Sequence, residues 1–226
     1  MDNVQSVILG KAGTGKSVFS RWMILRHIKQ HNKPVIVVDE SLDHWKTLQK
    51  CGFKRVELNK NLAYKSFDWT ALINEHRRIF VEVSGFMASE TAYLMDDISQ
   101  HVYNRGNLLL VVDEGHNFFG REEYSNEYAR LWRSGRKRGI DLYLTTQMVV
   151  DLNIIATKQA NVLISLQLTE ENELKKISPY FSTVNGSKPI EFLPLFGVGD
   201  YVIKDMRRGN QQISNTSSLQ GVKSLL

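Results

Sequence analysis

The chain has 226 residues, of which 42% are hydrophobic and 23% charged, a composition that excludes a disordered or fibrous protein. Its single cysteine excludes a disulfide framework and a cysteine-rich zinc site, and fits a reducing compartment. The net charge of +5 allows a polyanionic partner without demonstrating one. The apolar runs are too short to span a bilayer, and no charged-then-apolar leader follows Met1, so we expect neither a membrane span nor a secretory signal.

Apolar runs alternate with amphipathic stretches along the chain. Runs rich in β-branched residues predict strands, and apolar residues at helical spacing predict helices. In chain order we expect a strand over 4–9, a helix over 16–30, strands over 35–39, 55–58 and 78–83, a helix over 89–105, a strand over 107–112, a helix over 126–138, strands over 140–145 and 161–167, a short helix over 170–177, and an edge strand or hairpin over 199–204.

This alternation predicts parallel βαβ units, and therefore an α/β fold with a mainly parallel sheet flanked by helices on both faces. We expect a single domain over 1–206. Beyond Arg208 the chain is rich in Ser, Asn and Gln, so a flexible tail is expected over 207–226.

A phosphate-binding motif connects the first predicted strand to the first predicted helix. The segment is Gly10-Lys11-Ala12-Gly13-Thr14-Gly15-Lys16-Ser17, which matches G-x-x-x-x-G-K-[ST] at every position. We expect residues 10–18, up to Val18, to bind ATP, because the glycines let the backbone approach phosphate oxygens. Lys16 is expected to contact the β- and γ-phosphates and Ser17 to bind Mg²⁺. For Lys11, two positions remain as alternatives: it faces the nucleotide, or it faces the pore of a ring. A glycine-rich turn without nucleotide is the alternative.

An acidic pair closes the most hydrophobic predicted strand. Asp113 is placed to hold the Mg²⁺ shell, and Glu114 to polarise a water for in-line attack on the γ-phosphate. The alternative is an acidic strand end that opens a loop. A signalling GTPase is not expected, because no N-K-x-D segment follows a late strand.

A basic stretch follows in the helix expected over 126–138. Arg130, Arg133 and Arg136 recur every third residue, so on a helix they would lie along one side. The strand after this helix ends in Thr145-Thr146-Gln147.

The order of these motifs resembles the FtsK–HerA superfamily of ring-forming ATPases that pump double-stranded DNA. That superfamily has a D-E strand, a helix ending in R-x-x-x-x-G-R-x-x-G, and an apolar strand ending in T-Q. The matching residues here are Asp39, Asp113-Glu114, Arg130 with Gly135-Arg136-Lys137-Arg138-Gly139, Thr146-Gln147 and the run 160–164. The resemblance covers about residues 4–168. It departs at Met148-Val149-Val150, where many relatives carry R-P-S, which leaves the role of that loop open.

The resemblance implies a RecA-like (ASCE) sheet, a hexameric ring and ATP bound between subunits. It also implies that Gln147 senses the γ-phosphate and that an arginine reaches the neighbouring subunit's ATP, where a guanidinium stabilises the transferred phosphoryl group. Arg136 is our first choice for this arginine finger, with Arg133 and Arg130 as alternates. A solvated basic helix face, and a polar strand end for Gln147, remain the alternatives.

A bare motor of this size is most like the genome-packaging ATPases of membrane-containing double-stranded DNA viruses, since we expect no added barrel, anchor or winged-helix module. We therefore expect ATP-driven translocation of double-stranded DNA by a homo-oligomeric ring. A viral capsid-vertex or membrane protein is a candidate partner. The expected location is the cytoplasm, that of the host if the protein is viral, or the virion.

Three other functions stay open. The first is a cellular or mobile-element HerA-like DNA pump, and the second a small-molecule or nucleotide kinase with the arginine stripe as a lid. The third is a nucleotide switch that does not hydrolyse. The Asp113-Glu114 pair argues against the switch, because a switch needs no general base.

Overall fold

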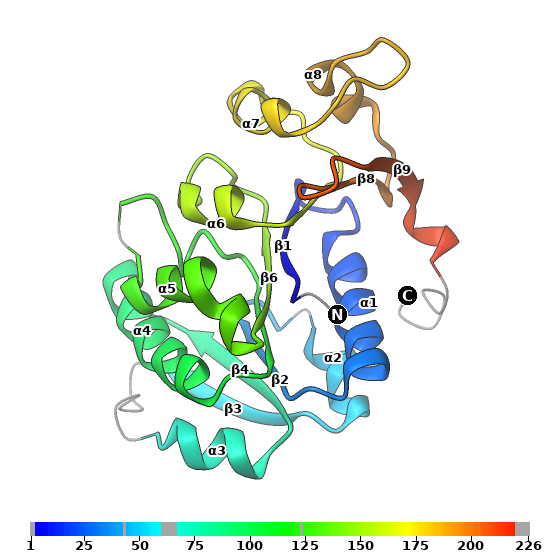
Figure 1. Ribbon diagram of the computed structural model, residues 1–226. Helices are drawn as coiled ribbons and strands as arrows, with labels where there is room; N and C mark the ends of the chain where they lie inside the picture. Colours follow the sequence, from blue (N-terminus) through cyan, green and yellow to red (C-terminus); the bar gives the residue numbers. More distant parts are fainter. Residues whose placement is uncertain (1–2, 43, 60–66, 123, 220–226) are drawn as a thin grey trace.

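The computed structural model describes residues 3–42, 44–59, 67–122 and 124–219, and its strands form one nine-stranded sheet (Figure 1). The strand order is β3-β4-β2-β5-β6-β1-β7-β8-β9. Strands β1 to β7 are parallel, whereas β8 pairs antiparallel with both β7 and β9. The bounds are β1 (Gln5–Leu9), β2 (Val35–Asp39), β3 (Lys54–Asn59), β4 (Arg78–Ser84), β5 (Leu109–Val112), β6 (Asp141–Thr146), β7 (Val162–Ser165), β8 (Asp200–Asp205) and β9 (Gln211–Asn215).

Short and medium helices connect the strands. They are α1 (Lys16–His31), α2 (Trp45–Leu48), α3 (Trp69–Glu75), α4 (Ala88–Arg105), α5 (Asn126–Ser134), α6 (Ile154–Gln159), α7 (Glu171–Ile177) and α8 (Pro189–Phe192). Single 3₁₀ turns include η3 (Gly135–Arg138), η5 (Leu193–Leu195) and η6 (Thr216–Ser218). None of the helices in the described ranges is both long and apolar enough to cross a membrane.

Both faces of the central part of the sheet are buried, because alternate side chains of its strands belong to different cores, as β2 shows. Val35 and Val37 of β2 pack in one core with Ile24 of α1. Ile36 and Val38, between and after them, pack in the opposite core. The second core also takes in α4 and α5, through residues that include Leu94, Ile98, Tyr128, Leu131 and Trp132. The expected α/β class, with a mainly parallel sheet and helices on both faces, is confirmed.

The strand order separates β1 from β2, the next strand along the chain. The chain leaves β1 through α1 and re-enters the sheet at β2, three places away, so β6 and β5 lie between the two strands. Parallel sheets bind ligands outside the carboxyl ends of their strands, at points where the strand order reverses. The loops after β1, β2, β5 and β6 all open at this edge.

The helix expected over 126–138 is shorter in the structure. It ends at Ser134, whose hydroxyl donates to the Arg130 carbonyl oxygen at 2.9 Å, and residues 135–138 form η3. A serine hydroxyl that bonds back to the preceding turn competes with the helical hydrogen bonds. Arg136 therefore does not continue the helical stripe of Arg130 and Arg133.

The segment expected as a flexible tail also differs from the structure. Residues 211–215 form β9, in register with β8, and η6 follows. The Asn215 side chain donates to Asp200 Oδ1 at 2.7 Å, and the Thr216 N–H donates to the Gly199 carbonyl at 2.8 Å. Polar residues thus form an edge strand, which their composition did not indicate. Residues 220–226 lie outside the described residues.

Candidate active site

The loop after β1 has the conformation that its glycines permit. Gly13 and Gly15 have φ values of 78° and 97°, which other residues adopt only with strain. A Cβ on Gly10 would lie 2.9 Å from Leu166 Cβ, so the close approach of the loop to the strand-end of β7 also requires glycine. The conformation of the loop therefore requires glycine at these positions, as the motif predicts.

The first turn of α1 is open to an anion. The helix begins at Lys16 with Gly15 at its N-cap, where no side chain caps the turn. Free N–H groups and the helix dipole both favour a negative charge at such a position. The residues expected to bind nucleotide, 10–18, form this loop and turn, with Lys16 buried and Ser17 half-buried. They stand together as the sequence predicts.

Glu114 extends from the end of β5 to the phosphate-binding loop over residues 10–17, which we call the P-loop. Its Oε1 lies 3.1 Å from Lys16 Nζ, and its Oε2 accepts the backbone N–H of Gln147 at 3.2 Å. The Glu114 backbone has a left-handed φ of 45°, and the next N–H, of Gly115, donates to the Thr145 carbonyl at 2.7 Å. A strained backbone held by neighbouring contacts is typical of functional sites. The expected lysine, acidic residue and glutamine are thus brought together.

Asp113 is buried directly behind this cluster. Its Oδ2 lies 3.3 Å from His44 Nε2, and its Oδ1 accepts the Thr145 hydroxyl. Burial by itself raises the pKa of a carboxyl group, but the His44 charge and hydrogen bond, the Thr145 hydroxyl and the Lys16 charge hold the pKa of Asp113 well below its ordinary value. Asp113 is therefore an ionised carboxylate that can bind a cation.

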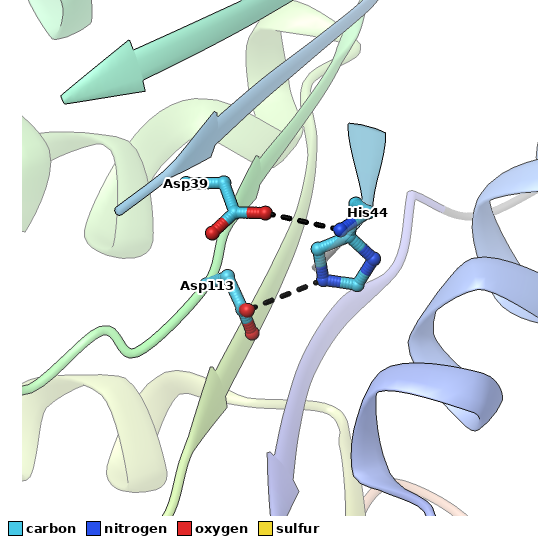
Figure 2. Close-up of side chains that lie close together, drawn as sticks. All are labelled: Asp39, His44 and Asp113. Atoms are coloured by element: carbon cyan, nitrogen blue, oxygen red, sulfur yellow. Dashed lines mark hydrogen bonds and ion pairs between the residues drawn. The ribbon is translucent and has the colours of Figure 1, made fainter. Parts of the chain in front are cut away.

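A third acidic side chain completes a buried cluster with His44 (Figure 2). Asp39, at the end of β2, accepts the His44 backbone N–H at 3.3 Å and the Ser41 N–H at 2.7 Å. Asp39, His44 and Asp113 each expose 2% or less of their surface, and their potential ligand atoms lie within 4.8 Å of one another. Two buried carboxylates are therefore held against one imidazole.

The imidazole lies where two carboxylates favour its charged form. Burial lowers the pKa of His44, but the Asp113 charge and hydrogen bond and the Asp39 charge outweigh burial and raise that pKa above its ordinary value. Sequence analysis named Asp39 and Asp113 but missed His44, which follows β2 in a segment without a motif.

His116 adds a neutral group beside Glu114. Its Nδ1 lies 2.9 Å from Thr146 Oγ1, in the hydrogen-bond range, and 3.5 Å from Glu114 Oε2. Burial lowers the pKa of His116, and the nearby Glu114 charge only partly offsets that effect. The ring is therefore uncharged near neutral pH. It fixes the position of the β6 end from which Gln147 extends.

The three arginines lie away from the P-loop of their own chain. Arg130 is exposed, pairs with Glu127 at 3.1 Å and stacks 3.8 Å from the ring centroid of Tyr103. The carbonyl oxygen of Arg136 accepts the Asn3 side-chain N–H at 2.6 Å, which places η3 at the amino end of β1. The P-loop follows the carboxyl end of this five-residue strand, about 16 Å away at about 3.3 Å per residue. Arg133 is exposed on α5. The structure therefore does not place any of the three arginines at the P-loop of the same chain.

The chain matches the zonular occludens toxin (Zot) family over residues 6–184. No curated protein matches its sequence. Among solved structures it is similar to the genome-packaging NTPase B204 of Sulfolobus turreted icosahedral virus 2 bound to AMPPCP, with TM-score 0.71, 20% identity, and 94% of this chain and 97% of that chain covered.

Two further structures share the fold. The DNA-packaging ATPase B204 of Sulfolobus turreted icosahedral virus has TM-score 0.68 and 24% identity over 95% of this chain and 98% of its own. VirB4 of Thermoanaerobacter pseudethanolicus has TM-score 0.74 and 10% identity over 97% and 90%. These matches show that the chain has the P-loop ATPase fold that the resemblance to FtsK–HerA-type ATPases implies. A family match over most of the chain, on a P-loop ATPase fold, shows that this chain belongs to the Zot family.

Proposed function

We propose that this protein is an ATPase that works as a ring of identical subunits and translocates double-stranded DNA. The observation that carries the proposal is the meeting of Lys16, Glu114 and Gln147 at the P-loop, with the ionised Asp113 behind them. A phosphate cradle, a general base and a charged ligand are the parts that phosphoryl transfer to water requires.

Glu114 is the residue that would activate the attacking water. The water gives its proton to the carboxylate as its oxygen attacks the γ-phosphorus, and the bond to the β-phosphate oxygen breaks. In the structure this carboxylate is paired with Lys16 at 3.1 Å. The γ-phosphate carries more charge than one carboxylate, so bound ATP would draw Lys16 away and leave Glu114 free to accept the proton.

The residues beside the P-loop fit Mg²⁺. The Ser17 hydroxyl and the ionised Asp113 carboxylate are oxygen donors, which Mg²⁺ prefers, and the remaining positions would be filled by phosphate oxygens and water. The ion would neutralise charge between the β- and γ-phosphates. Asp113 would hold it from the protein side, with Thr145 and His44 fixing the carboxylate.

The placement of the arginines supports action between subunits. Arg130, Arg133 and Arg136 belong to α5 and η3, and η3 lies at the amino end of β1. An arginine so placed can reach an ATP only in another subunit, which would make hydrolysis depend on assembly. We propose Arg136 as the finger, with Arg133 and Arg130 as alternates, in a hexameric ring.

The DNA substrate is proposed from two observations. The chain has a net charge of +5, and B204, which shares its fold, is a genome-packaging NTPase. A translocase holds phosphates without reading bases, so its binding should weaken steeply as salt rises. On this proposal the protein works in the cytoplasm, anchored by a capsid-vertex or membrane protein.

The test measures ATP hydrolysis with duplex DNA, with single-stranded DNA and without DNA, beside gel filtration with and without ATP. We expect oligomers and turnover that rises with duplex DNA, and Lys16→Ala to abolish turnover. If single-stranded DNA stimulated ATP turnover as much as duplex DNA does, the proposed substrate would have to include single strands. Turnover by a monomer that ignores both forms of DNA would overturn the proposal, and phosphate transfer to an added acceptor would indicate a kinase.

A further inference from the structure

The connection from η5 to β8 exposes unusual apolar surface. Within the described ranges, Leu195 and Val198 are the two most exposed large hydrophobic side chains, at 82% and 77%. Phe196 between them is 8% exposed and packs into the core. We call residues 195–199 the apolar ledge. Leu195 and Val198 thus leave apolar surface in water, which a ligand could cover.

The apolar ledge is fastened to the P-loop at both of its ends. The Gly199 N–H donates to the Thr14 carbonyl at 2.9 Å. At the other end, the Gln167 side chain donates to the Pro194 carbonyl at 2.9 Å, and the Gln167 carbonyl accepts the Lys11 N–H at 3.0 Å. Figure 1 shows the start of β8 beside the loop that follows β1. The ledge and the loop therefore form one surface.

The sheet order decides which part of a nucleotide would meet this surface. Glu114 and Gln147 follow β5 and β6, which lie on one side of β1, whereas β7 and β8 lie on the other side. A triphosphate in the P-loop with its γ-phosphate at Glu114 directs its nucleoside to the opposite side. We infer that the apolar ledge binds the nucleobase of the substrate through Leu195 and Val198; this inference rests on the proposed function.

The apolar ledge contacts a base without reading its edges. Asp200 accepts the Gly197 N–H at 2.7 Å through one carboxylate oxygen and the Asn215 side-chain N–H at 2.7 Å through the other. The Asn215 oxygen accepts the Ser217 N–H at 2.8 Å. These polar side chains are already engaged. Apolar sites discriminate similar ligands by only about 10- to 200-fold, whereas hydrogen-bonding sites reach about 10⁴-fold.

The test compares the binding of ATP, GTP and inorganic tripolyphosphate by calorimetry for wild type, Leu195→Ser and Val198→Ser. Tripolyphosphate lacks a nucleoside, so it reports on the P-loop alone. Each variant should weaken ATP and GTP by about fivefold to tenfold, the loss expected from partial apolar contact. Tripolyphosphate affinity should stay unchanged. Ile213→Ser, on β9 of the same hairpin and 39% exposed, is the matched control and should leave all three ligands unchanged.

Four results would overturn the inference. The first three are unchanged ATP affinity in both variants, equal weakening of ATP and tripolyphosphate, and a wild-type preference between ATP and GTP beyond about 10³-fold. The fourth is loss of oligomers with intact ATP binding, since the ledge would then be a subunit contact. The proposed function would fail by a different result. If the wild-type protein bound ATP through the ledge but hydrolysed none of it, the inference about the ledge would stand and the proposed ATPase activity would be refuted.

Discussion

Glu114 contacts the two groups that a γ-phosphate would also meet, the Lys16 ammonium and the Gln147 backbone N–H. Without nucleotide, the carboxylate neutralises the lysine and is itself unavailable as a base. On the proposed function, substrate binding and release of the base are coupled through this ion pair. Asp113 is held by His44 and Thr145, and Thr145 also accepts the Glu114 backbone N–H at 3.3 Å, so the two acidic residues share a neighbour.

Glu114→Gln should abolish turnover and preserve ATP binding. General-base catalysis contributes about 10²- to 10⁴-fold, so single-turnover hydrolysis should fall by about that factor. ATP affinity should hold or rise, because Lys16 loses its ionic partner. Filter binding and single-turnover assays measure the two effects. Glu75→Gln, at a side chain that is 73% exposed, is the control. Equal loss of binding and turnover would contradict the assigned role.

His27 should make the fold sensitive to acid. Burial lowers its pKa to about 4, and the nearby Asp141 offsets only part of that effect. An unfolded histidine takes up its proton near pH 6.5. Between these values the unfolded state binds more protons, so stability is fully present above about pH 6.5 and is lost as pH falls through about 4, by up to about 3 kcal/mol.

Urea unfolding of wild type and His27→Gln between pH 7 and pH 4.5 measures this contribution. The variant should lose less stability on acidification than wild type does. His76→Gln, at a partly exposed histidine that follows α3, is the control. A wild-type pH profile in the His27 variant would refute the prediction.

At the scale of elements, the β8–β9 hairpin is tied to the P-loop although it lies near the end of the described chain. Gly199, just before β8, donates to the Thr14 carbonyl, and the segment around it is held by Asn215 at the end of β9 and by Thr216 in η6. The pairing of β9 therefore bears on the geometry of the P-loop. This connection spans about two hundred residues of sequence.

A comparison of Gly199→Ala with Gly209→Ala separates the cost of backbone strain from the cost of a steric clash. Both glycines have a left-handed φ, of 85° and 73°, so either substitution costs about 1–2 kcal/mol. A Cβ on Gly199 would also clash with Thr216 Oγ1, whereas nothing lies within 4 Å of one on Gly209. Overpacking should add about 1–3 kcal/mol at Gly199. Denaturant unfolding and ATP titration should show that only Gly199→Ala also weakens ATP binding.

At the scale of the whole molecule, Arg136 and the residues proposed for catalysis lie at different edges of the sheet. Lys16, Glu114 and Asp113 lie near the carboxyl ends of the strands, and η3 with Arg136 lies at the amino end of β1. The proposed function therefore expects a neighbouring copy to supply the arginine, and a ring of copies to complete every site.

Mixing experiments test this arrangement. Arg136→Ala subunits should retain ATP binding but lower the activity of wild-type partners, so turnover should fall more steeply than the wild-type fraction. Lys137→Ala, at the next and exposed position, is the control and should change little. Turnover that stays proportional to the wild-type fraction would remove Arg136 as the finger. The same mixtures with Arg133→Ala and Arg130→Ala then decide between the alternates.

The local sequence determined the P-loop, the Asp113–Glu114 pair and the α/β class. Each depends on contiguous residues or on periodicity, because backbone conformation and strand burial follow from neighbours along the chain. The fold implied by the order of the motifs was confirmed for the same reason: the motifs are short and keep their order.

Only the tertiary structure decided which distant residues meet. His44 became part of the Asp113 cluster because β2 and β5 are adjacent in the sheet, and no spacing in the sequence records that pairing. The apolar ledge joined the P-loop because β8 lies two places from β1, and Arg136 was separated from it because η3 precedes β6. Such contacts depend on strand order and register, which long-range packing selects.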